Sequence, residues 1–282
     1  MNNKIIVDAG SSKVEWTLLS NDGKVLQRMT SDGVNALMIS SAEATRHFSD
    51  IRDALGQSES VSEVHYYGAG CATSVVCDKI HQVLSGVWQA GIINVSSDLL
   101  GAARSLFGHE EGIACILGTG SNSCLYDGKE IIKNVPSLGY ILGDEGSGSS
   151  LGRRLIADAF KGHLPSAIKD SFISRYKVSL PDILDNVYRS PKPNKYMASL
   201  VPFLSEHLWN PYIYSLVLEE FTNFVKRNIA MYPGAHSLPI AFTGSIAYYF
   251  EEILTDALER QGYKVSKVTR TPMEGLIAFH SK

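Results

Sequence analysis

The stretch 113–122, IACILGTGSN, joins a short apolar run to a glycine-rich turn, and this combination decides the fold. A similar stretch, IIVDAGSSK, occupies residues 5–13. After each copy comes a second strand-like segment and then an acidic-glycine turn, at Asp22-Gly23 and at Asp127-Gly128. The copies lie about 105 to 110 residues apart, which is the length of a domain rather than of a solenoid repeat. The sequence therefore predicts that one fold is present twice.

Both turns have the composition of a phosphate-binding loop. Glycine allows the backbone to approach a ligand closely, and successive N–H groups in a tight turn form a concave site for phosphate oxygens. The hydroxyl groups of Ser12 and Thr119 can donate to the same oxygens. Asp8, at the end of the first apolar run, is placed to hold Mg²⁺ through water. An ordinary hairpin turn is the alternative for either copy alone, but the duplication favours phosphate binding.

Composition is typical of a globular protein. The 282 residues suffice for two domains with separate cores, and 44% of them are hydrophobic and 20% charged. The net charge of −3 offers no basic field for nucleic acid or for an anionic membrane surface. No apolar stretch approaches the ~20 residues that span a bilayer, and the amino terminus does not resemble a signal sequence. We therefore expect a cytoplasmic protein that binds neither nucleic acid nor membrane.

The cysteines are expected to be reduced. The sequence has four cysteines, Cys71, Cys77, Cys115 and Cys124, and no two of them form a Cys-x-x-Cys motif. Cys115 and Cys124 fall in strand patterns, where a thiol is most simply a small buried apolar group. Neither a disulfide framework nor a zinc or iron–sulfur site is predicted.

Hydrophobic periodicity predicts an α/β protein in which both halves begin with three strands. Strands are expected near residues 4–8, 13–19, 24–30, 64–67, 92–95, 113–117, 123–126, 130–135, 238–242 and 263–268. Helices are expected near 41–55, 74–88, 212–231, 247–261 and 273–279. The helix at 212–231 is part of a long helical region expected from Glu145 to about Tyr232. The second half therefore repeats the first and adds a helical segment.

Asp98 is a candidate general base. It follows the predicted strand 92–95 and begins a helix, where α/β active sites collect and where the helix N-terminus favours an ionised carboxylate. A helix N-cap is the alternative role, which Ser96 or Ser97 could fill instead. A second candidate, Asp144, lies among five glycines in 139–152, as in a mobile loop or a segment that approaches a ligand closely.

The charged residues that follow Asp144 in the sequence, an acid and an arginine pair, are expected to have no part in the chemistry. Glu145 is interpreted as a first-turn helix charge, and the pair Arg153-Arg154 as solvated helix charges. The residues themselves thus indicate a phosphate-binding protein with one or two functional carboxylates.

The pattern as a whole resembles the sugar kinase/Hsp70/actin superfamily of ATPases and, within it, the N-acetylglucosamine kinase-like BadF/BadG family. The resemblance covers nearly the whole chain. It rests on five motifs that occur in the same order as in that family: 8–13, Asp98, 117–122, 143–148 and 242–246. It implies two RNase H-like (actin-like ATPase) domains with a nucleotide cleft between them. The implied domains are 1–108 and 109–271, the latter with a helical insertion, and the C-terminal helix 272–282 is expected to pack back on the first domain.

The resemblance also implies site residues. Those matching ATP contacts are Asp8, Gly10, Ser11, Ser12, Lys13, Gly118, Thr119, Gly120, Gly244 and Ser245. Those matching sugar contacts are Asn35, Asp98, Ser121, Asn122, Gly139 and Asp144. The chain departs from the family at Ala9 and Ser11, where glycine is usual, and at Ser12, where threonine is usual. It also has Ser137-Leu138 where relatives of the eukaryotic N-acetylglucosamine kinase have Gly-Trp, which leaves the sugar open.

The implied activity is ATP-dependent phosphorylation of an amino sugar, N-acetylglucosamine or glucosamine-like, at a primary hydroxyl, with Asp98 as general base and Mg²⁺ on Asp8. Two alternatives remain. One is an ATPase activator of a radical dehydratase or reductase, which needs cysteines converging on a dimer axis. The other is a non-catalytic sugar-sensing protein of the same fold, against which Asp98 argues. The expected partner is a small amino sugar, and the oligomeric state stays open, a homodimer included.

Overall fold

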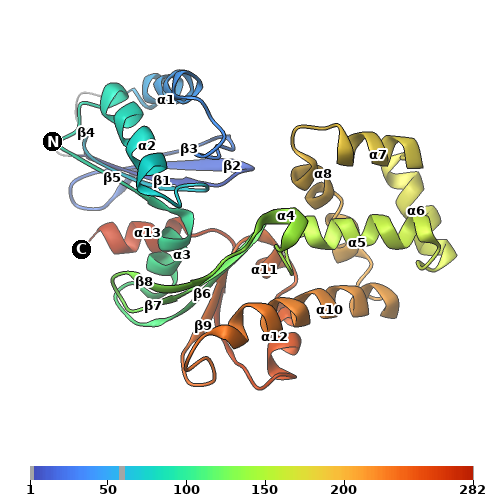
Figure 1. The fold of residues 1–282 in the computed structure, drawn as a ribbon. Coiled ribbons are helices and arrows are strands. Elements are labelled where there is room, and N and C mark those ends of the chain that lie inside the picture. The colour runs from blue at the N-terminus through green and yellow to red at the C-terminus, as the bar shows by residue number, and fades with distance from the viewer. Residues whose placement is uncertain (1–2, 57–60, 282) are drawn as a thin grey trace. The chain divides into compact units, whose positions relative to one another are not determined.

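The computed structural model describes residues 3–56 and 61–281, which form two compact units. The first unit comprises the chain up to Glu110 together with Asp127–Ile131 and the residues from Thr271 onward. The second comprises Glu111–Tyr126 and Ile132–Arg270. Each unit contains one five-stranded sheet with helices packed on it (Figure 1).

The sheet of the first unit has the order β3-β2-β1-β4-β5. Its strands are β1 (Asn3–Ala9), β2 (Lys13–Leu19), β3 (Val25–Asp32), β4 (Val61–Gly68) and β5 (Ile92–Ser97). β2 runs antiparallel to β1 and β3, whereas β1, β4 and β5 are mutually parallel. The carboxyl ends of these three parallel strands therefore meet at one edge of the sheet.

Helices cover both faces of this sheet. α1 (Ser41–Leu55) and α2 (Ser74–Val87) lie on one face, where Phe48 and Ile80 join a core that includes Trp16. α3 (Asp98–Phe107) and α13 (Met273–His280) lie together on the other face (Figure 1). Alternation along β1 thus feeds two separate apolar layers, as the period of two requires.

The sheet of the second unit has the order β10-β9-β6-β7-β8 and so repeats the first. Its strands are β6 (Gly112–Leu117), β7 (Ser121–Tyr126), β8 (Ile131–Val135), β9 (Ile240–Thr243) and β10 (Val265–Thr269). β6 pairs antiparallel with β7 and parallel with β9, and β9 is parallel with β10. The expected α/β fold class with a duplicated strand pattern is confirmed.

The second unit carries most of the helices. They are α4 (Gly139–Leu142), α5 (Gly148–Lys161), α6 (Ser166–Tyr176), α7 (Leu180–Tyr188), α8 (Pro193–Ser199), α9 (Pro202–Glu206), α10 (Pro211–Arg227), α11 (Ser245–Tyr249) and α12 (Glu251–Glu259). α5 to α8 extend away from the sheet of this unit (Figure 1). Within the described residues, no helix has the length and apolar character that a membrane span requires.

Two local predictions differ from the structure. The helix expected over 247–261 is divided at Phe250, whose backbone leaves the helical region while its ring is buried. The long helical region expected from Glu145 begins instead with α5 at Gly148, and the short helix α4 precedes it within the glycine-rich segment 139–152. In both places tertiary packing overrides a pattern that local spacing alone describes poorly.

Candidate active site

Carboxylates gather at the carboxyl edge of the sheet in the first unit. Asp8 lies one residue before the end of β1 and is paired in register with Glu15 of β2. The pKa of Asp8 is raised to about 7, by burial first and then by repulsion from Asp98 and Glu15, while Lys13 lowers it. The structure therefore brings the predicted metal residue Asp8 within electrostatic reach of the predicted base Asp98.

Asp98 is the first residue of α3, but it is not the residue that caps the helix. Ser97 is the N-cap, and its hydroxyl oxygen accepts a hydrogen bond from Leu100 N at 3.2 Å. Asp98 Oδ1 accepts a hydrogen bond from Leu99 N at 2.9 Å. Burial raises the pKa of Asp98, while the backbone N–H groups hold it down. Because Ser97 fills the capping role, that alternative does not explain why a carboxylate stands at position 98.

The first glycine turn is closed tightly between β1 and β2. Gly10 N donates to Lys13 O at 3.0 Å, and the Lys13 side chain is exposed, with Nζ 3.5 Å from Glu15 Oε2. The backbone after β3 packs directly on the turn, since a Cβ at Gly33 would lie 2.2 Å from Ser11 O. Ser11 and Ser12 are half-buried at this point. A backbone so closely packed presents its amide groups at fixed positions.

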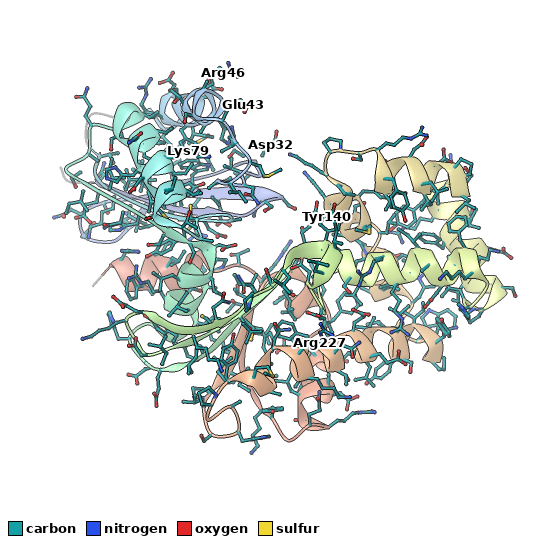
Figure 2. All side chains as sticks on the ribbon, in the orientation of Figure 1. Asp32, Glu43, Arg46, Lys79, Tyr140 and Arg227 are labelled. Carbon is teal, nitrogen blue, oxygen red and sulfur yellow. The ribbon has the colours of Figure 1, made fainter. Side chains whose placement is uncertain are left out.

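Asn35, the first predicted sugar contact, lies beside the first turn. Its Nδ2 donates to Ser11 Oγ at 3.4 Å, and its Oδ1 accepts from Leu37 N at 3.0 Å. Gly70 has φ +84°, and a Cβ on it would lie 2.4 Å from Asn35 Oδ1. Lys79 of α2, labelled in Figure 2, fastens the same loop by donating to Ile39 O at 2.9 Å. The structure thus places a predicted sugar residue next to a predicted phosphate residue.

The second glycine turn is fastened to the start of α5. Gly118 N donates to Gly120 O at 3.0 Å, while Gly118 O accepts from Gly148 N at 2.8 Å. Thr119 O accepts from Ser149 N at 3.0 Å. Within the described parts of the chain, nothing accepts a hydrogen bond from Gly120 N. With its carbonyl groups occupied in this way, the turn retains an amide donor suited to an anion.

Asp144 lies directly against the second turn. Its Oδ1 accepts from Ser121 N at 3.1 Å, and a Cβ on Gly120 would lie 3.0 Å from its Oδ2. Burial raises the pKa of Asp144 to about 6, the Ser121 N–H lowers it, Glu145 raises it and Arg153 lowers it. Gly120 therefore makes room for a buried carboxylate, a requirement that the sequence alone did not suggest.

The turn that was matched to adenosine contacts the same region. Gly244 has φ +120°, and a Cβ on it would lie 2.3 Å from Leu117 O, immediately before the second glycine turn. Gly244 N donates to Thr269 O at 3.0 Å, and Ser245 begins α11 with an exposed side chain. Only glycine fits this conformation and this approach.

Two other predicted sugar contacts, Asn122 and Gly139, lie in the second unit. Asn122 Oδ1 already accepts from Ser123 N at 2.9 Å and from Asn134 Nδ2 at 2.9 Å. Gly139, with φ +71°, begins α4 directly after Leu138, which has φ 58° and a side chain that is 62% exposed. The carboxamide oxygen of Asn122 thus serves the sheet, and its Nδ2 is the group that could face a ligand.

One prediction about charges is wrong. Glu145, expected in the first turn of a helix, precedes α5 and forms an ion pair with Arg227 at 2.5 Å. Arg154, expected to be solvated, bonds Glu219 at 2.5 Å and lies 3.9 Å from Glu220 Oε1. Local sequence could not reveal these pairs, since their partners lie on α10, more than 60 residues away in the chain.

One solved structure matches the chain along its full length. It is a candidate N-acetylglucosamine kinase from Porphyromonas gingivalis, with 41% identity, a TM-score of 0.94, and coverage of 100% of this chain and 99% of that one. The chain belongs to the N-acetylglucosamine kinase-like BadF/BadG family. The predicted family, the actin-like ATPase fold and the sugar-kinase class of enzyme are thereby confirmed.

More distant structures share the fold of this BadF/BadG member. A candidate N-acetylglucosamine kinase from Chromobacterium violaceum has 18% identity and a TM-score of 0.76, with 99% of each chain covered. A ROK-family glucokinase from Streptomyces griseus, solved with glucose and AMPPNP, has 14% identity and a TM-score of 0.54 and covers 99% of this chain and 98% of its own. No protein-family model and no curated protein matches the chain.

Proposed function

We propose that this protein transfers the γ-phosphoryl group of ATP to a primary hydroxyl of an amino sugar, N-acetylglucosamine or a close relative. The observation that carries the proposal is Asp98: a half-buried carboxylate at the carboxyl edge of a parallel sheet, with a pKa that desolvation raises and with the helix cap supplied by its neighbour Ser97. Similarity to the candidate N-acetylglucosamine kinase from Porphyromonas gingivalis supports the choice of sugar. An amino sugar also needs hydrogen-bond acceptors for its hydroxyl groups, and the Asp144 carboxylate is suited to that role.

In this proposal Asp98 accepts the proton of the acceptor hydroxyl as its oxygen attacks the γ-phosphorus, and ADP leaves. A base for this step must lie within hydrogen-bond reach of the hydroxyl and have a pKa near the working pH. Burial moves the pKa of Asp98 upward, in the direction that strengthens it as a base. The raised pKa and the position at the strand end therefore suit the same role.

The nucleotide is assigned to the glycine turns and to Gly244-Ser245. Gly120 N is an unused donor, and the Cβ position of Gly118 has no atom within 4 Å, so a phosphate can approach the backbone there. Loose phosphoryl transfer depends mainly on positioned donors and charge neutralisation. The second turn fits this requirement because α5 fixes its carbonyl groups.

The residues in the first unit fit a magnesium ion. Asp98 and Glu15 both raise the pKa of Asp8 by repulsion, and a divalent cation relieves such repulsion. Mg²⁺ commonly keeps several waters and uses one or two protein carboxylates together with phosphates. Asp8 would hold it, and the bound ion would neutralise charge on the phosphates.

The test is a coupled assay of ADP release across a panel of free amino sugars, with wild type, Asp98→Asn and Ser97→Ala. Asp98→Asn should lower turnover ~10²- to 10⁴-fold with ATP affinity retained, since a general base contributes about that factor. Ser97→Ala removes only the cap and should cost about 1 kcal/mol of stability while turnover persists. If Asp98→Asn turns over like wild type, or if no amino sugar stimulates ADP release, the proposal is wrong.

The two alternatives have less support. An activator with an iron–sulfur cluster needs accessible thiolates, whereas Cys115 and Cys124 are buried in the sheet and burial raises the pKa of both thiols. A sugar sensor needs no proton acceptor, whereas Asp98 has the raised pKa that suits a general base.

A further inference from the structure

A polar cavity adjoins the segment that carries Asp144. Its volume is about 310 Å³, and its walls include Gly143, Glu145, Arg153, Glu220 and Arg227. Every one of these residues belongs to the second unit. Figure 2 marks Arg227 on α10, and it also marks Tyr140 on α4, the helix that leads into the segment.

The segment 143–147 has an unusual backbone that its own sequence does not enforce. Asp144 adopts φ +56°, a left-handed conformation that costs a non-glycine residue about 1 kcal/mol. Gly143 is pressed against Ser137, because a Cβ there would lie 2.0 Å from Ser137 O. Such a conformation persists only where surrounding contacts determine it.

Gly146 already packs on α10, where a Cβ would lie 3.1 Å from Phe224 Cβ and 3.3 Å from Phe221 Cδ1, whereas Glu145 faces the cavity. The links across it are polar. Glu145 Oε1 lies 2.5 Å from Arg227 Nε, which joins the segment to the last residue of α10. Arg153 donates to Tyr140 O at 3.4 Å from the α5 side.

We propose that Glu145 and Arg227 are positioning residues, and that their ion pair ties the segment 143–147 to α10 and so holds the Asp144 carboxylate against the second turn for sugar binding. The proposal rests on the function proposed above, in which Asp144 accepts hydrogen bonds from the sugar. Sugar affinity should therefore depend on Arg227, which lies on a helix more than 80 residues away in the chain.

The charges around Asp144 predict pKa changes that would separate a positioning role of the ion pair from a purely structural one. Asp144 faces Ser121 N from β7, Arg153 from α5 and the neighbouring Glu145, whose own charge Arg227 of α10 neutralises. Removing Arg227 leaves Glu145 as an unpaired anion, which should raise the pKa of Asp144. Replacing Glu145 by glutamine removes the like charge and should lower it.

The experiment compares Arg227→Ala, Arg227→Lys and Glu145→Gln with wild type, using N-acetylglucosamine as the probe. Arg175→Ala is the matched control, because it breaks the exposed Arg175–Glu206 pair in the same unit. Arg227→Ala should raise the KM for sugar about fivefold with the KM for ATP unchanged, equivalent to about 1 kcal/mol. The acidic limb of the pH profile for sugar KM should move to higher pH in Arg227→Ala and to lower pH in Glu145→Gln. Arg227→Lys should recover part of the wild-type affinity.

A second readout does not depend on activity. Because Asp144 Oδ1 accepts from Ser121 N, hydrogen exchange at the Ser121 amide should accelerate in Arg227→Ala and not in Arg175→Ala. Arg227 is 64% exposed, so the variant is expected to fold. Unchanged exchange at Ser121 refutes the proposal whether or not the protein phosphorylates the probe. Unchanged sugar KM in an active protein refutes it while leaving the proposed function intact.

Discussion

The two glycines of the second turn should separate nucleotide binding from sugar binding. Neither has a positive φ, so alanine is conformationally permitted at both positions. A methyl group on Gly118 meets no atom within 4 Å in the second unit, whereas a methyl group on Gly120 lies 3.0 Å and 3.2 Å from the two Asp144 oxygens. We predict that Gly118→Ala weakens ATP binding and that Gly120→Ala weakens sugar binding.

The magnitude at Gly120 follows from this contact. The Asp144 carboxylate must retreat by a few tenths of an ångström, and the hydrogen bond from Ser121 N, already 3.1 Å, stretches beyond useful length. A hydrogen bond to a charged group contributes about 1.5 to 3 kcal/mol. Because relaxation recovers part of that, we expect the KM for sugar to rise about tenfold in Gly120→Ala.

The assay is steady-state kinetics with each substrate varied in turn, supported by calorimetric titration of ATP without sugar. Gly118→Ala should raise the KM and Kd for ATP and leave the KM for sugar near wild type. Gly120→Ala should show the reverse order of effects. Equal effects of both variants on both substrates would mean that the turn is a structural hairpin, and the reasoning would be refuted.

Two further predictions concern stability. Burial, with His65, Arg104 and Lys4, lowers the pKa of His280 to about 3, so the unfolded state binds the extra proton below about pH 6.5 and stability falls on acidification. Urea titrations should show that His280 lowers the free energy of unfolding by about 1 kcal/mol at pH 5 relative to pH 7, a value reduced to allow for the partial exposure of the ring. His280→Gln should remove this loss. An identical pH dependence in wild type and variant would contradict the prediction. By the same method, Gly244→Ala should lower the free energy of unfolding by about 2 to 3 kcal/mol, because its methyl group meets Leu117 O. The control Gly162→Ala, at φ +80° with open space around the methyl group, should lower it by about 1 kcal/mol. Equal losses in the two variants would show that the contact with Leu117 is unimportant.

Much of the fold could be predicted because its signals are local. The helix expected at 41–55 coincides with α1, where Ser40 and Glu43 form a capping box and Gly56 ends the helix. Alternation in 13–19 likewise predicted β2. The duplicated glycine turns then indicated the repeated strand order, since a strand, a tight turn and a hairpin recur only when the architecture does.

The surroundings of the candidate site could be predicted only in part. That Ser97 rather than Asp98 caps α3 was one of two stated alternatives, and hydrogen-bond geometry was needed to decide between them. The pair Glu145–Arg227 could not be found, because no spacing rule relates a loop to the end of a helix so far along the chain. Contacts of high sequence separation leave no local pattern, and here one of them pairs Arg227 with the Glu145 that lies beside Asp144.

The two copies of the fold differ in the charge at equivalent strand ends, and this difference suits each to a separate task. In the first unit Asp8 lies one residue before the end of β1 and Asp98 directly follows β5, and burial together with repulsion from Asp98 and Glu15 raises the pKa of Asp8. In the second unit the strand that corresponds to β5 is β10, and the residue after it is Arg270, which lies over the Tyr249 ring instead of facing an acid. A proton acceptor and a cation site require anions, whereas a phosphate site is served by amide donors without nearby anions. Asp144, the carboxylate that the structure places against the second turn, has a pKa of about 6 and accepts from Ser121 N, and no described atom lies within 4 Å of the Cβ position of Gly118, so that end of the turn suits the phosphates of the proposed function.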